Sequence, residues 1–396
     1  MWVVLASSML PRLAMKFPIL CLPLVSFIIS WICTYLIKRI APRLNFVDKP
    51  GHRKIHYVPK PLGGGIAIFL GMALPLATAM LAVLVLPSPT GVPTAYWSGA
   101  KQQIPLGLGV LLAMLGMHLL GLWDDRKALG PFIKLFIQLG IITALVVAME
   151  LFARHTPSLR LRVLTHLDRI LSLGPLPSIV LTVLWIGVIT NAFNFLDNMD
   201  GLSAGIAAVC ATAFLITALS IGQYFVAAML AMLVGSLMGF LCFNFPPATI
   251  FMGDSGSLLI GFVLGLLTVR TTYLPPELDI AHGWYALFVP VIVLALPLYD
   301  FIVVSLIRIS RGKSPFVGDT NHFSHRLVAR GMSRRTAVLC LYLITAATSI
   351  AAIILPHVGS TFGAILIFAQ TILVLCVVAL LEQHPLPIPP DLGTSA

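Results

Sequence analysis

The hydrophobic positions of the chain fall into long uninterrupted runs separated by polar connections. A membrane-spanning helix needs about 20 apolar residues, and most of the runs approach that length. None of them alternates apolar and polar positions as a barrel strand does. The pattern therefore predicts an all-α, polytopic membrane bundle with about eleven transmembrane helices. The predicted spans are 17–37, 65–86, 105–123, 132–150, 176–195, 202–221, 224–243, 257–270, 284–306, 336–355 and 361–381.

The same pattern predicts a single transmembrane domain over residues 17–381. No polar connection is long enough to fold as a separate soluble domain. Residues 1–16 precede the first span and contain Met15, a second candidate start, so the mature chain could lack this segment. Residues 382–396 form a Pro-rich tail that we expect to be disordered.

Composition agrees with a membrane protein. Of the 396 residues, 59% are hydrophobic and 10% are charged, whereas soluble domains carry about 25% charged residues. So few polar groups could not cover the surface of a soluble fold. The six cysteines lie inside apolar runs and form no CxxC pair, so we expect neither a disulfide framework nor a zinc site.

Positive charge gathers on one side of the predicted bundle. If the connections alternate between faces, 17 of the 25 Lys and Arg residues fall on one face, and the positive-inside rule makes that face cytoplasmic. The outer loop 151–175 is an exception, since it carries four Arg. No basic run is interleaved with aromatic residues, so we expect no nucleic-acid partner.

Half of the 14 acidic residues fall on this same face, where ionisable groups beside membrane spans are functional candidates. The first group is Asp124 and Asp125, which end a span and precede Lys127 and Lys134. Adjacent carboxylates repel, so the pair needs a cation or a shared proton. The alternative is a cap for the next helix, which would need only one of the two acids.

The second group recurs every third residue in NAFNFLDNMDGLSAG, residues 191–205. In a continuous helix, Asn191, Asn194, Asp197 and Asp200 would spread over half of the circumference. They can converge only if the helix ends, which the glycines that follow permit. The alternative is an ordinary capped helix end followed by a turn.

The third group lies in FNFPPATIFMGDSGSLLIGF, residues 243–262, where two prolines stop one helix and GDSG opens the next. Asp254 could be a plain N-cap. It could also bind a metal at a helix N-terminus, where backbone N–H groups can hold phosphate. The run Gly63–Gly65 is a weaker candidate for close approach of the backbone to an anion.

The fourth group is the basic loop 308–335, which contains Arg308, His322, His325 and Arg326. A positive-inside loop alone would need no histidine, so the two histidines favour a functional loop. They share one face if the stretch is helical.

These residue types suit phosphoryl transfer. Carboxylates and amides without thiols favour Mg²⁺, with Mn²⁺ as a possible substitute, over Zn²⁺. The surplus Lys, Arg and His side chains can neutralise a diphosphate. Positioning and charge stabilisation do most of the work in such sites. Because the site lies at a membrane face, we expect one lipid substrate and one soluble phosphate ester.

The four motifs, in this order, resemble the polyprenyl-phosphate N-acetylhexosamine-1-phosphate transferases, or glycosyltransferase family 4, from about residue 35 to 335. The loop spacing SPF-x-x-D-x-x-H-x-x-H-R resembles the branch that uses UDP-N-acetylglucosamine. The resemblance implies that N-acetylglucosamine 1-phosphate is transferred to undecaprenyl phosphate with Mg²⁺ and that UMP is released. It further implies an integral protein of the bacterial cytoplasmic membrane, with the site on the cytoplasmic face and a homodimer as one option.

The resemblance also implies roles for single residues. Asp254 matches the family's magnesium ligand, with Asp197 in the same metal region. In the acidic pair, one carboxylate is expected to activate the lipid phosphate. The expected catalytic residues are Asp124, Asp125, Asp197, His322 and His325. The expected substrate-binding residues are Lys127, Lys134, Asn191, Asn194, Asp200, Arg308 and Arg326. Ser324 departs from the family pattern, because many relatives have a histidine there.

Four alternatives stay open at this point. The donor could be another UDP-N-acetylhexosamine. The chain could be a non-catalytic relative that acts as a scaffold, for which Ser324 is the only support. It could be a secondary transporter, although those place their acids near the membrane midplane. A CDP-alcohol phosphotransferase is the fourth, but DGLSAG lacks the arginine and the further acids of that class.

Overall fold

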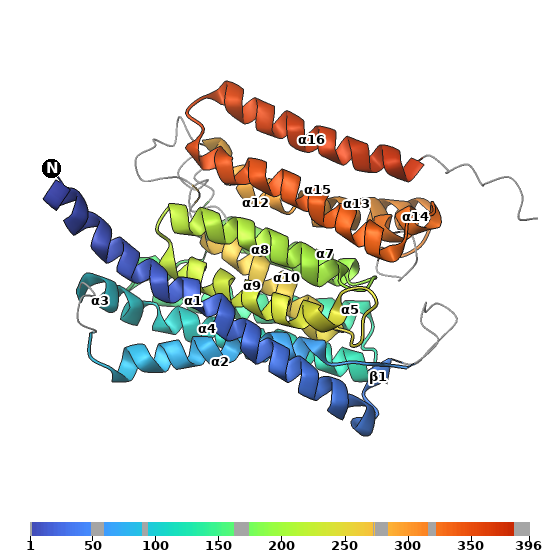
Figure 1. The fold of residues 1–396 in the computed structure, drawn as a ribbon, viewed down its shortest axis with the longest axis horizontal. Coiled ribbons are helices and arrows are strands. Elements are labelled where there is room, and N and C mark those ends of the chain that lie inside the picture. Colours follow the sequence, from blue (N-terminus) through green and yellow to red (C-terminus); the bar gives the residue numbers. More distant parts are fainter. Residues whose placement is uncertain are drawn as a thin grey trace, which may run out of the picture.

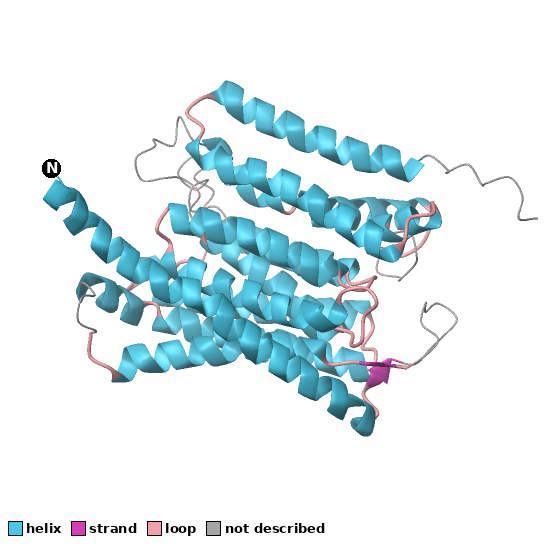
Figure 2. Ribbon diagram, in the orientation of Figure 1, coloured by secondary structure: helices cyan, strands magenta, loops and turns pink. Residues whose placement is uncertain are grey.

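A computed structural model describes residues 2–48, 59–88, 94–161, 174–271, 273, 284–315 and 322–383. Nearly all of them are helical, and the helices lie side by side in one bundle (Figures 1 and 2). The two strands, β1 (Val47–Asp48) and β2 (Lys60–Pro61), have two residues each. The predicted all-α class is confirmed. Of the predicted tail, residues 384–396 lie outside the described residues.

The long helices follow the predicted runs. They are α1 (Trp2–Ile40), α2 (Gly64–Val85), α4 (Ile104–Arg126), α5 (Pro131–Phe152), α7 (Pro175–Leu196), α8 (Leu202–Ser220), α9 (Tyr224–Asn244), α10 (Asp254–Arg270), α13 (Ala295–Ser310), α15 (Arg334–Ile354) and α16 (Thr361–Gln383). The shorter ones are η1 (Ala41–Leu44), α3 (Thr94–Gln102), η2 (Pro157–Leu159), η3 (Trp284–Phe288), α12 (Val289–Val293), α14 (Phe323–Ala329) and η4 (Leu355–His357).

Within the described residues, nine helices are long and apolar enough to cross a membrane, or ten if one bent pair counts as a span. The bent pair falls on the predicted span 284–306. Within it the chain turns by 66° before α13, so the span is not one continuous helix. Pro297 explains the break, because a proline ring clashes with the carbonyl four residues earlier, here that of Val293. The remaining predicted run, 257–270, is α10, which has 17 residues and is buried along almost its whole length.

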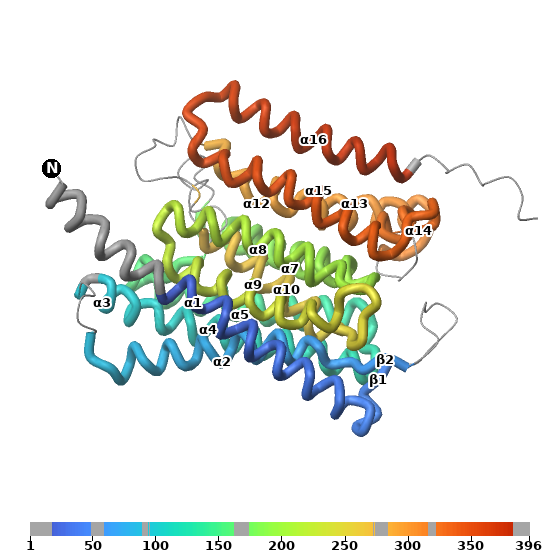
Figure 3. Tube along the Cα trace, in the orientation of Figure 1, coloured from blue at the N-terminus to red at the C-terminus, as the bar shows by residue number. Residues whose placement is uncertain are grey.

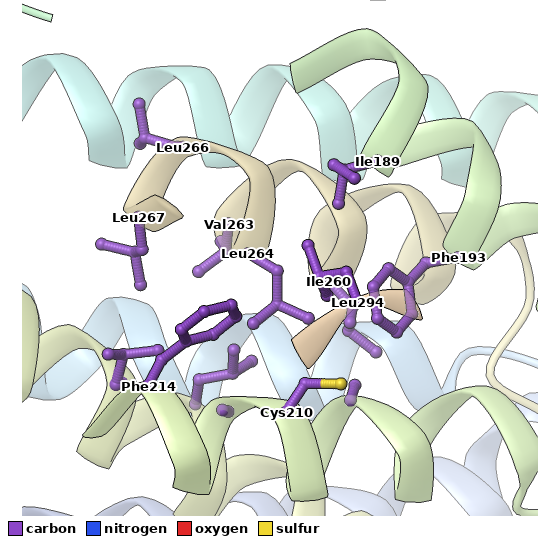
Figure 4. Close-up of a cluster of buried hydrophobic side chains, with 14 of the residues drawn as sticks. Ile189, Phe193, Cys210, Phe214, Ile260, Val263, Leu264, Leu266, Leu267 and Leu294 are labelled. Atoms are coloured by element: carbon purple, nitrogen blue, oxygen red, sulfur yellow. The ribbon is translucent and has the colours of Figure 1, made fainter. Parts of the chain in front are cut away.

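Helix α10 forms the centre of the bundle. It is apolar all round, and such a helix is stable only when its neighbours cover it. Its side chains Ile260, Val263 and Leu264 pack between residues of the neighbouring helices, such as Phe193 and Phe214 (Figure 4). The beginning of α10, which carries Asp254, is therefore fixed by the helices around it.

Two glycines bring α2 and α4 against the beginning of α10. A Cβ atom added to Gly121 of α4 would lie 2.4 Å from the Cα of Ser255, and one added to Gly65 of α2 would lie 2.3 Å from a backbone nitrogen. The expectation that the glycine run approaches an anion is wrong in this structure. The N–H groups of Gly64 and Gly65 donate to the carbonyls of Phe251 and Met252, at 3.0 and 3.1 Å.

The four motifs meet at one end of the bundle. Helices α4, α7 and α13 end there, and α5, α8, α10 and α15 begin there. Strand β1 and helix α14 mark this end, and helix α3 lies at the opposite end (Figure 3). We call it the motif end below. The alternation of connections that the hydrophobic pattern predicted thus brings the motifs together.

Candidate active site

Lys134 stands at the middle of a carboxylate cluster at the motif end. Its ammonium group donates to Asp254 and lies 3.3 Å from Asp124 Oδ2. It also donates to Asn194 Oδ1 at 3.4 Å. The other oxygen of Asp124 accepts the N–H of Leu129 at 2.8 Å, which holds the turn between α4 and α5. One cation therefore joins α4, α5, α7 and α10, and of the acidic pair it contacts Asp124 and not Asp125.

Asp125 holds the first turn of α10. Its two oxygens accept the backbone N–H groups of Asp254 at 2.7 Å and Ser255 at 3.2 Å. A helix N-terminus offers such unpaired N–H groups and favours a negative charge. Gly253 makes room, since a Cβ atom there would lie 2.5 Å from the Asp125 carboxylate. The alternative that one acid of the pair caps a helix is thus correct for Asp125. The helix that it caps is α10, however, and not α5, which follows in sequence.

The Asn and Asp residues of the second motif separate into different environments. Helix α7 ends at Leu196, which was the condition for these residues to converge, but they do not all meet at one point. Asn194 donates to Asp254 Oδ1 and to Ser257, both at 2.9 Å. Asn191, one turn deeper, donates to Gln138 of α5 at 2.9 Å. Asn194 therefore belongs to the carboxylate cluster, whereas Asn191 ties α7 to α5 below it.

Asp197 and Asp200 lie in the turn between α7 and α8. Asp200 accepts the N–H of Ala248 at 2.9 Å, and Lys60 donates to the carbonyl of Ala248. The carboxylate of Asp197 has no hydrogen-bond or ion-pair partner among the described residues. Burial, and after it the negative charges of three neighbouring carboxylates, raise the pKa of Asp197 well above its usual range. Asp197 is thus a carboxylate that an added cation would stabilise.

The donor set fits Mg²⁺ and not a metal held by protein alone. Among the described residues, no three His, Cys, Asp or Glu side chains lie close enough to enclose an ion. Magnesium usually takes one or two carboxylates and completes its shell with water and substrate phosphate. Asp254 and Asp197 could supply those carboxylates.

A second polar cluster surrounds His322. Asp300 of α13 accepts from His322 Nδ1 at 2.7 Å and from the N–H of Phe323 at 3.1 Å. His322 Nε2 faces an Arg308 nitrogen at 3.3 Å. All three side chains are buried. Because Nδ1–H donates to the carboxylate, Nε2 accepts from Arg308, and both ring nitrogens of His322 are engaged.

Phe195 connects the two clusters. It precedes the end of α7, the Arg308 guanidinium lies 4.9 Å from its ring centroid, and the His322 ring meets its edge at 6.2 Å. Phe195 follows Asn194 directly in sequence, so the two clusters share one turn of α7. Arg308 is thereby held against the end of α7 by its contact with Phe195 and by His322.

The other expected residues lie around these clusters. Ser324 is fully buried and donates to Asn198 Oδ1 at 2.6 Å, so this position joins α14 to the turn after α7. The His325 ring lies 6.4 Å from that of His322. Arg326 forms an ion pair with Glu382 at 2.8 Å. Lys127 is exposed just after α4.

Three polar residues near the site were absent from the expected site residues. His118, buried inside α4, contacts the carbonyl of Ser255 at 3.1 Å and stacks on Phe69. Asp300 orients His322, and Glu382 pairs with α14. His118 and Asp300 are ionisable residues inside apolar runs, which is the signal that could have identified them. Glu382 directly follows the last predicted span and was assigned to the Pro-rich tail, whereas the structure places it in α16.

Comparison with known proteins identifies the family. The model of glycosyl transferase family 4 matches residues 107–272. A protein of Bacillus subtilis (strain 168), named probable undecaprenyl-phosphate N-acetylglucosaminyl 1-phosphate transferase, is 32% identical over 348 residues, which is 87% of each chain. The chain belongs to this family. The expected resemblance is confirmed, and so is the branch that it suggested.

Two further relatives show how far the similarity extends. Decaprenyl-phosphate N-acetylglucosaminephosphotransferase of Mycolicibacterium smegmatis is 33% identical over 81% of this chain and 78% of its own length. Phospho-N-acetylmuramoyl-pentapeptide-transferase of Desulforudis audaxviator is 34% identical, over 64% of this chain and 76% of its own length. The relatives named for N-acetylglucosamine therefore match more of this family member than the muramoyl relative does.

Proposed function

We propose that this family member transfers N-acetylglucosamine 1-phosphate from UDP-N-acetylglucosamine to undecaprenyl phosphate. An oxygen of the lipid phosphate would attack the β-phosphorus of the donor. The bond from that phosphorus to the UMP oxygen would break, which leaves undecaprenyl-diphospho-N-acetylglucosamine and UMP. The observation that carries the proposal is the cluster of Asp124, Asp254 and Asn194 around Lys134 at one end of a membrane bundle.

The proposed roles follow from the contacts. Both oxygens of Asp125 accept backbone N–H groups, which favours Asp124 as the carboxylate that meets the lipid phosphate. Lys134 would neutralise the diphosphate as well as the acids that now surround it. Arg308, held by His322, would add positive charge on the other side of Phe195.

We propose Mg²⁺ as the cofactor, with Asp254 and Asp197 as its protein ligands. Bound there, the ion would neutralise negative charge on the diphosphate. We further propose that the motif end faces the cytoplasm of a bacterial inner membrane, because positive charge gathers there. A homodimer stays an expectation from the family.

The direct test is turnover by the purified protein in detergent. Undecaprenyl phosphate is combined with labelled UDP-N-acetylglucosamine or UDP-N-acetylgalactosamine, with Mg²⁺ or with EDTA, and UMP release and lipid labelling are followed. The proposal expects labelled lipid with UDP-N-acetylglucosamine and Mg²⁺, and none with EDTA. Labelling only from UDP-N-acetylgalactosamine would change the donor. A folded protein that labels no lipid under any of these conditions would refute the transferase activity.

Asp254→Asn tests the metal site in the same assay. We expect it to abolish turnover, because the variant keeps the shape of the side chain but loses the charge that a metal ligand needs. Glu150→Gln is the matched control, since Glu150 pairs with Arg160 at 3.7 Å near the end of α5 that lies opposite the motif end. Turnover by Asp254→Asn at the unmodified rate would remove Asp254 from the metal site.

A further inference from the structure

The last helix ends in a buried carboxylate that the proposed chemistry does not use. Glu382 stands at the end of α16, and only 7% of it is exposed. Of the nine candidate spans among the described residues, α16 has the smallest share of buried residues, so most of this helix is exposed on the outside of the bundle. A carboxylate buried at a membrane face is costly unless it is paired. The position therefore calls for a specific reason.

Glu382 is held by two partners from different elements. Its Oε2 lies 2.8 Å from an Arg326 nitrogen of α14 and accepts from the Tyr299 hydroxyl of α13 at 3.2 Å. Tyr299 directly precedes Asp300, the residue that holds His322. The carboxylate thus closes a link from α16 to α14 and back to the part of α13 that orients the histidine.

Helix α14 depends on such links because it is short. It has seven residues. An isolated helix needs about 12 residues to be even marginally stable in water. Its beginning is fixed twice, by Asp300 at His322 and Phe323 and by Asn198 at Ser324. Arg326 provides the polar anchor one turn further on. Without Glu382, that anchor would lose its charged partner.

From this arrangement we propose that Glu382 is a positioning residue for the transfer reaction: through Arg326 it fixes α14, and with it His322 and Arg308, against the carboxylate cluster. The inference rests on the proposed function. It assigns Arg326 to this ion pair and not to direct contact with the donor.

The test is a double-mutant cycle of Glu382→Gln and Arg326→Gln, which keep side-chain size. We expect each to lower kcat by about 10-fold to 100-fold, as small misplacements of reacting groups do, and to change the KM for the UDP-sugar less than about twofold. The double variant should be no slower than either single variant. Tyr299→Phe removes one hydrogen bond, and we expect a smaller effect in the same direction.

Glu150→Gln is again the control, because it breaks an ion pair far from α14 and should leave kcat unchanged. Unaltered kcat in Glu382→Gln would overturn the proposal. So would a rise in KM in Arg326→Gln that Glu382→Gln does not share, or single effects that multiply in the double variant. The first result would show that α16 does not position the site. The other results would indicate that Arg326 contacts the donor directly.

A second readout does not depend on turnover. Hydrogen exchange of the amides of residues 323–329 reports how firmly α14 is held. We expect faster exchange there in Glu382→Gln and no change in Glu150→Gln. If Glu382→Gln speeds exchange but the unmodified protein has no transferase activity, the anchoring role of the ion pair is supported and only the proposed function is refuted. Unchanged exchange in Glu382→Gln, beside an active unmodified protein, would refute the anchor alone.

Discussion

Asp125 offers the sharpest test of how the acidic pair divides its work. Both of its oxygens accept N–H groups at the beginning of α10, at 2.7 and 3.2 Å. We therefore expect Asp125 to hold Asp254 in place and not to react. Asp125→Asn keeps one accepting oxygen, but it turns an NH₂ group toward the other N–H donor. Asp125→Ala removes both acceptors.

The size of the effect follows from the hydrogen bonds. A bond to a charged partner contributes about 1.5–3 kcal/mol. Asp125→Asn loses one such bond. If that loss weakens the hold on Asp254, the Mg²⁺ concentration for half-maximal rate should rise by about 10-fold to 150-fold. Asp125→Ala loses both bonds and leaves two N–H groups without partners, so we expect it to lower the thermal stability of the protein as well.

The assay is UMP release by Asp125→Asn as Mg²⁺ is varied from micromolar to tens of millimolar. Recovery of much of the rate at high Mg²⁺ would support the positioning role. The reasoning is refuted if the rate stays more than about 100-fold lower at saturating Mg²⁺ while the Mg²⁺ dependence is unchanged, because a lost general base lowers the rate by about that factor or more. Asp125 would then be the reacting carboxylate, and Asp124 would not.

Three further predictions concern the charges and the packing of the site. Lys134→Met removes the cation among the carboxylates and should lower kcat at least about 100-fold. Lys134→Arg should be similarly slow, because a planar guanidinium does not replace the compact ammonium group. UMP release measures both variants. Asp300→Asn places an amide against two donors, so about 1–3 kcal/mol of stabilisation is lost around His322; kcat should fall while the KM for the UDP-sugar holds, and an unchanged kcat would contradict this role. Gly121→Ala puts a methyl group 2.4 Å from the backbone of Ser255 and should prevent folding. Gly140→Ala meets nothing within 4 Å, so this variant should fold normally, and its free energy of unfolding should be unchanged or higher by up to about 1 kcal/mol. Detergent size-exclusion profiles compare the two variants.

The sequence predicted the fold and the location of the site for one physical reason. Polar groups are scarce in a chain whose solvent is mostly lipid, so nearly every acid beside a span stands out. That logic identified Asp124, Asp197 and Asp254 without any structure. It also made an end of α7 the condition for the second motif to converge; α7 does end at Leu196, but Asn191 and Asp200 still lie apart from Asn194.

Side-chain pairing lay beyond the sequence because the partners come from distant helices. The family resemblance implied that Arg326 binds the substrate, but its partner, Glu382, lies at the end of α16. Spacing within the second motif grouped Asn191 with Asn194, but one helical turn separates them, and Gln138 takes the first. The hydrophobic pattern shows which face of a helix is polar. It does not show which neighbour that face meets.

The carboxylates at the motif end differ in whether they have a partner within the protein. Asp124 and Asp254 share Lys134, Asp125 caps α10, and Asp300 holds His322. Each of these acids has a protein partner, as burial beside a membrane demands. Asp197 has none within the part of the chain that the structure describes, although neighbouring carboxylates crowd it. We propose that a cation which enters with the diphosphate substrate is its complement, because such a cation would also supply the charge neutralisation that phosphoryl transfer needs.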